Sequence, residues 1–150
     1  MTIASKLRFA LTGVMIGASV ALGAGCAFAQ SAPSKEDQEM LVKTTLLTFN
    51  DANLTGDYSV LRAKSSKPFR DQFDEAKLKE IFKDFVEKKV DISVVAVKPA
   101  IPDKDGAVDK NGVLELSGSF ATTPKVVKYK LDYFVSEGVW KPYGIHVSTE

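Results

Sequence analysis

The sequence predicts an α+β domain in which helices come first and an antiparallel sheet follows. Apolar residues recur at helical spacing between residues 35 and 88, whereas from Val90 onward many of them alternate with a period of two. Pairs such as Asn111-Gly112 and Glu137-Gly138 separate the later runs, which is typical of hairpins between consecutive strands. Helices followed by such a meander are expected to cover one face of a single sheet.

Residues 1–29 are typical of a secretory signal peptide rather than of a folded domain. Lys6 and Arg8 precede an uncharged run of small and apolar residues, which ends in Ala-Phe-Ala at residues 27–29. This order of a positive region, an apolar region and a small-residue cleavage site predicts export, to the periplasm or out of a bacterial cell. Cleavage after the last of these alanines would leave residues 30–150 as a single domain.

Two other fates of this leading segment stay open. The run from Phe9 to Ala29 is long enough to cross about 30 Å of hydrocarbon as a retained helical anchor. The sequence that ends at Cys26 is similar to the site at which bacterial lipoproteins are lipidated. Only in these two cases do we expect the protein to be attached to a membrane. Since Cys26 is the only cysteine, a chain cleaved after residue 29 has no disulfide and no thiolate nucleophile.

The charged and metal-ligating residues exclude several classes of partner. Loss of residues 1–29 changes the formal net charge from +1 to −1, and nucleic-acid binding requires a basic surface. A single histidine without cysteine cannot supply the three or four ligands of a zinc site. The acidic residues between 103 and 115 do not have the spacing of a calcium loop. We therefore expect no nucleic-acid partner, no metal and no cofactor.

Three helices are predicted before the sheet. The first runs from Lys35 to Leu54, because Ser34 and Gly56 supply the start and stop signals around a periodic apolar stripe. Residues 58–66 predict a short second helix that Pro68 prevents from continuing.

The third predicted helix begins at Asp74. One of its faces is apolar, and the opposite face is charged and is expected to be solvated. The apolar stripe consists of Leu78, Ile81, Phe82, Phe85 and Val86.

Four later runs predict strands. Residues 90–101 are rich in β-branched residues, and residues 113–121 and 126–135 alternate apolar with polar side chains. The last strand, residues 139–148, reads VWKPYGIHVS and contains the only tryptophan and the only histidine of the chain.

A period of two assigns the last strand's side chains to two faces. Trp140, Pro142, Gly144 and His146 would share one face, and Val139, Tyr143, Ile145 and Val147 the other. Both faces are then largely apolar, although a single sheet with one solvated face should alternate. We therefore expect a homodimer in which the partner subunit covers the outer sheet face at Tyr143, Ile145 and Val147. A tail or helix of the same chain is the alternative cover.

The succession of three helices and a long sheet ending in GVWKPYGIHVS resembles the nuclear transport factor two-like superfamily, whose members include ketosteroid isomerase and SnoaL-like polyketide cyclases. The segment NDANLTGDY is similar to the end of the first helix and its turn, and Trp140, His146 and Ser148 match the spacing in the last strand of many members. The resemblance covers nearly all of residues 30–150. It implies a cystatin-like cone, in which a strongly curved antiparallel sheet carries three helices and encloses a pocket at its wide end.

The residues that would line such a pocket are Tyr129, Tyr133, Trp140 and His146. The Asp and Tyr motif of ketosteroid isomerase cannot be matched residue by residue, because Asp57 fits a helix cap, Asp71 a surface position and Asp132 the polar side of a strand. We therefore assign no catalytic residue. The sequence favours a non-catalytic envelope domain that binds a small apolar ligand or a protein partner. The alternative is a small cofactor-free lyase or isomerase of the ketosteroid isomerase or SnoaL-like type.

Overall fold

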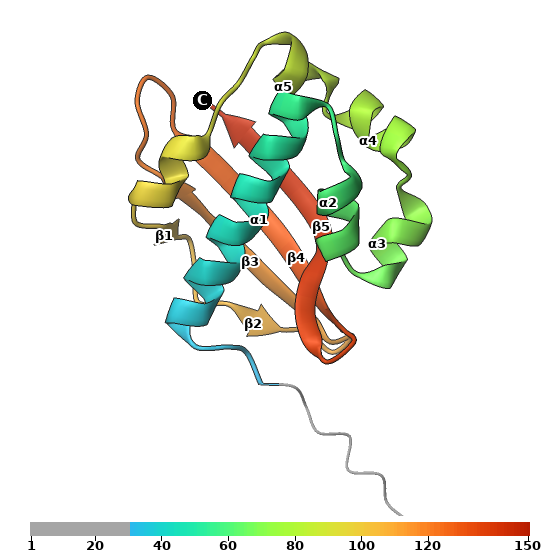
Figure 1. Ribbon diagram of the computed structural model, residues 1–150. Coiled ribbons are helices and arrows are strands. Elements are labelled where there is room, and N and C mark those ends of the chain that lie inside the picture. Colours follow the sequence, from blue (N-terminus) through green and yellow to red (C-terminus); the bar gives the residue numbers. More distant parts are fainter. Residues whose placement is uncertain (1–30) are drawn as a thin grey trace, which may run out of the picture.

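The computed structural model describes residues 31–150, so the predicted signal peptide and Cys26 lie outside the described residues. In this range five α-helices and one 3-10 helix accompany an antiparallel sheet of five strands that does not close on itself. The helix α1 crosses one face of the sheet diagonally (Figure 1). The α+β class is therefore confirmed. No helix within residues 31–150 combines the length and the apolar character needed to span a membrane.

The helix α1 (Lys35–Thr55) is the structural centre of the helical layer. The side chain of Ser34 accepts a hydrogen bond from the backbone N–H of Asp37, and Gly56 ends the helix in the left-handed conformation at φ 72°. Glycine adopts that conformation without the steric cost of a Cβ atom. The predicted start and stop of this helix are confirmed, and its buried face includes Leu46 and Phe49.

Four short helices follow: α2 (Ser59–Lys64), α3 (Lys67–Gln72), α4 (Glu75–Ile81) and α5 (Lys83–Glu87). The second predicted helix is confirmed. Pro68 lies in the first turn of α3, where a missing N–H has no intrahelical acceptor, and this additional helix was not predicted. The predicted third helix begins at its cap Asp74 but is interrupted at Phe82, which separates α4 from α5.

The strand predicted for residues 90–101 is wrong over most of its length. Ser93–Val97 form a 3-10 helix (η1), and only the last residue of the predicted strand pairs with the sheet, as part of β1 (Ile101–Pro102). The cause is the buried side chain of Asn50, whose Oδ1 accepts from the backbone N–H of Ile92 at 2.8 Å while its Nδ2 donates to Asp91. These bonds attach the segment to α1, and Ile92 is buried there.

The sheet order is β1-β3-β4-β5, with β3 (Val113–Phe120), β4 (Val127–Ser136) and β5 (Val139–Thr149). The short strand β2 (Ala107–Val108) also pairs with β3. All neighbouring strands are antiparallel, as the hairpin signals predicted. Alternate residues of β3 and β4 are buried beneath the helices. They are Leu114, Leu116, Phe120, Val127, Tyr129, Leu131 and Tyr133.

A β-bulge in β5 changes which side chains face inward. Asp132 pairs with Gly144, but the next residue of β4, Tyr133, pairs with Pro142, so Tyr143 is an extra residue without a partner in the ladder. The alternation of β5 is therefore reversed at the bulge. The predicted common face of Trp140 and His146 is wrong for this reason.

The bulge also removes two of the three dimer-face candidates from the outer face. Ile145 pairs with the buried Leu131, and Val147 pairs with Tyr129 and is 8% exposed, so both point toward the helices. Tyr143 stays exposed, at 40%. Outward positions are occupied by polar side chains such as His146, opposite Lys130. The apolar second face that motivated the homodimer is thus absent around these residues, and homodimerisation itself stays a prediction.

Candidate functional site: an apolar pocket beside Trp140

A pocket of about 380 Å³ lies between α1, α2 and the hairpin of β4 and β5. This volume is within the range of about 300 to 1,000 Å³ that small-molecule sites occupy. Two of the four predicted pocket residues, Tyr133 and Trp140, line it together. The remaining lining residues are Leu41, Thr44, Thr45, Thr48, Leu61, Ala63, Lys64, Val139, Lys141 and Pro142.

The α1 wall of the pocket carries hydroxyl groups that already have partners. The hydroxyl of Tyr133 donates to the backbone carbonyl of Leu41 at 2.9 Å. Because a phenol has one proton, Thr45 Oγ1 must be the donor in its 2.9 Å hydrogen bond with the same hydroxyl. Thr48 Oγ1 donates to the carbonyl of Thr44 at 2.8 Å. A ligand can therefore contact this wall without leaving a buried donor unpaired.

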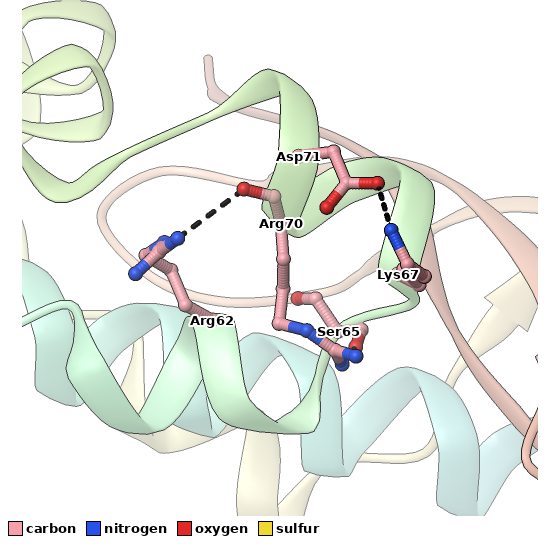
Figure 2. A network of polar contacts seen from close by, with 5 residues as sticks. All are labelled: Arg62, Ser65, Lys67, Arg70 and Asp71. Atoms are coloured by element: carbon pink, nitrogen blue, oxygen red, sulfur yellow. Dashed lines mark hydrogen bonds and ion pairs between the residues drawn. The ribbon is translucent and has the colours of Figure 1, made fainter.

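The α2 wall is held in place by two arginines that donate to backbone carbonyls. Arg62 donates to Phe73 at 2.9 Å and to Arg70 at 3.2 Å, and Arg70 in turn donates to the carbonyl of Ser65. Figure 2 shows Arg62 pointing across the junction of α2 and α3 to the backbone of Arg70. The backbone N–H of Ser66 donates to Pro142 in β5 at 2.8 Å. These bonds connect α2, α3 and the bulged strand, and thereby fix the pocket wall.

Trp140 forms part of the wall opposite α1. It is partly buried, packs against the hydrophobic core and follows the exposed Val139 at the start of β5. Trp140 was predicted to line a pocket, and the structure places it between the core and this pocket. Because it is the only tryptophan in the chain, all tryptophan fluorescence of the protein comes from this position beside the pocket.

The other two predicted pocket residues lie elsewhere. Tyr129 is buried over Gly118 and lines a smaller hollow of about 250 Å³ near the start of α1. Burial, with the negative charges of Asp103 and Glu39, raises the pKa of Tyr129 to about 12. His146 is exposed on the outer sheet face, where it borders a polar hollow of about 490 Å³ that Tyr129 also reaches.

The side chains that line the pocket include no general base for neutral pH. None of its lining residues is Asp, Glu, His or Cys. Burial raises the pKa of Tyr133, and its single proton is donated to the backbone of Leu41. The arrangement can therefore bind an apolar molecule, but its side chains supply no general base at neutral pH. Among the described residues there is also no group of three His, Cys, Asp or Glu side chains that could hold a metal ion.

The threonines and lysines of this site were not among the predicted pocket residues. Thr44, Thr45 and Thr48 lie on the same side of α1, at a spacing that brings residues three and four apart together on a helix. The signal available was the run KTTLLT at residues 43–48, in which hydroxyl side chains interrupt an apolar stripe. Lys64 gave no such signal, because its place at the pocket depends on the folding of α2 against α1.

Comparison with known proteins gives no relative from which a function can be transferred. No protein-family model, no curated protein and no solved structure matches the chain. The fold and the pocket define an α+β domain with an apolar pocket between α1, α2 and the hairpin of β4 and β5.

Proposed function

We propose that the protein is a non-catalytic pocket domain that binds a small apolar or amphipathic molecule. The observation that supports this most directly is the pocket of about 380 Å³ beside Trp140, in which the hydroxyls of Thr45, Thr48 and Tyr133 already have partners within the protein. An apolar cavity with few polar groups is the usual form of a small-molecule site. Its lining lacks the acid and base pair that the alternative, a cofactor-free lyase or isomerase, would need.

We also propose that the protein works in the bacterial envelope and that its fold is the nuclear transport factor two-like cone. The signal-like order of residues 1–29 supports export, and the intact mass of the exported protein would test it by giving a chain that begins at Gln30. A chain that begins at a lipidated Cys26 would contradict the proposal. The helices on one face of a bulged antiparallel sheet are compatible with the cone.

The neutral fluorescent probe N-phenyl-1-naphthylamine is expected to bind beside Trp140. With protein produced from the full sequence, titration should quench Trp140 emission in a saturable manner, because the probe absorbs where tryptophan emits. Replacing Thr44 by Phe places a ring in the pocket without removing a buried hydrogen-bond donor, since Thr44 contributes its carbonyl to the Thr48 bond. The Thr44→Phe variant should therefore lose at least about tenfold in affinity.

The matched control is Met40→Phe, which adds a ring to the same helix at an exposed position outside the pocket. Met40→Phe should bind the probe as the unaltered protein does. Equal probe binding by Thr44→Phe, in a protein with an unchanged circular dichroism spectrum, would place the binding site elsewhere and contradict the proposal.

A further inference from the structure

The charged side chains that line the pocket are all positive. Lys64 and Lys141 both line it, and no acidic residue does. Lys141 is neutralised by its ion pair with Glu137 in the turn between β4 and β5. Lys64, in contrast, takes part in none of the ion pairs formed by the described residues.

The ammonium group of Lys64 lies at the mouth of the pocket. Its Nζ atom donates to Thr48 Oγ1 at 3.2 Å, and Thr48 is buried at 8% exposure in the α1 wall, while the Lys64 residue as a whole is exposed. An ammonium group has three N–H donors, so two remain for another acceptor. The stem of the lysine lies along apolar surface and its charge meets the solvent, as long cationic side chains usually arrange themselves.

We propose that the pocket takes a single-chain amphiphile with an anionic headgroup, whose chain lies beside Trp140 and whose headgroup binds Lys64. This rests on the pocket function proposed above and adds the chemical class of the ligand. The anion would provide the positive charge of Lys64 with a partner at the boundary of the cavity, where charges attract more strongly than in bulk water. A cationic headgroup would be repelled, and a neutral one would gain only a hydrogen bond.

The test compares decanoate, decanol and decyltrimethylammonium, each below its critical micelle concentration, as ligands of the full-length protein. Trp140 fluorescence measures binding. The unaltered protein should bind decanoate at least about tenfold more tightly than decanol, because charge-assisted hydrogen bonds are worth more than neutral ones. The cationic amphiphile should bind least tightly.

Variants of Lys64 separate the headgroup from the chain. Lys64→Gln should weaken decanoate binding about tenfold and change decanol binding by less than about twofold, while Lys64→Arg should keep most of the preference. Lys98→Gln is the matched control, since it removes one positive charge from an exposed lysine outside the pocket. It should leave all three affinities unchanged.

The outcomes distinguish the two proposals. Equal binding of decanoate and decanol, unaffected by Lys64→Gln, would overturn the headgroup inference and leave the apolar pocket standing. A preference for decanoate that survives Lys64→Gln would overturn the role of Lys64. Absence of saturable binding by any of the three amphiphiles would overturn the pocket function, and the headgroup inference with it.

Discussion

Phe49→Ala is expected to destabilise the protein by about 3 to 5 kcal/mol. Phe49 is 0% exposed and lies in the C-terminal half of α1. Its ring meets those of Phe82 and Phe85 edge to face, with ring centroids 4.9 and 5.1 Å apart, so that one side chain connects α1 with the α4 and α5 segment. Removal of the Phe49 ring leaves a cavity where α1 packs against Phe82 and Phe85. The loss is large against the about 5 to 15 kcal/mol that stabilises a typical domain.

Urea denaturation followed by circular dichroism measures this effect. Leu54→Ala is the matched control, because Leu54 lies on the same helix at 53% exposure and alanine is a good helix former. Its midpoint should change little. A loss below about 1 kcal/mol for Phe49→Ala would show that α4 and α5 do not pack on α1 through this ring.

Val147→Glu is expected to cost about 3 to 5 kcal/mol, because it would leave an unpaired carboxylate in the core beneath the helices. Val147 is 8% exposed and pairs with the buried Tyr129. The neighbouring change His146→Glu introduces the same side chain one residue earlier, on the outer face and opposite Lys130. It should be neutral or slightly stabilising, since opposite charges facing each other across two strands attract.

This pair of variants also tests the β-bulge. Without the extra residue Tyr143, the period of two that assigns Trp140 to the inner face would place His146 inside and Val147 outside. Thermal melting of the two variants decides between the arrangements. A stable Val147→Glu protein together with an unfolded His146→Glu protein would contradict the bulged pairing of β5 with β4.

The parts of the fold that local signals determine could be predicted from the sequence. Ser34 and Gly56 mark the ends of α1 through side-chain capping and a positive φ, which depend on nearby residues alone. The alternation of residues 113–121 and 126–135 likewise predicted β3 and β4, because the side chains of a strand alternate between a buried and a solvated face.

The errors arose where a distant contact outweighs local preference. The β-branched run around Val95 favours a strand, but hydrogen bonds of Asn50 with Asp91 and Ile92 attach the start of the segment to α1, and a 3-10 helix follows. In the last strand the sequence itself contains a signal for the bulge. Pro142 and Gly144 interrupt a run that otherwise reads as a strand, and both residues are typical of bulges.

Part of the site could also be predicted from local signals. Tyr133 and Trp140 both lie on the inner face, on adjacent strands, so the alternation and the hairpin together were sufficient to bring them to one cavity. His146 was predicted on the wrong face because an unbroken period of two does not allow for the bulge. Lys64 belongs to the site because α2 packs on α1, where Leu61 is buried and the Lys64 ammonium group donates to Thr48.

The most direct test of ligand binding in this pocket is a two-dimensional ¹H–¹⁵N NMR titration of the protein with decanoate. The single tryptophan gives one indole N–H signal, which should move saturably together with the backbone amides of Thr44 and Lys64. The amides of Lys130 and His146, on the outer sheet face, should stay in place. Shifts confined to that outer face, or none at saturating decanoate, would contradict the proposal that the protein binds ligands beside Trp140.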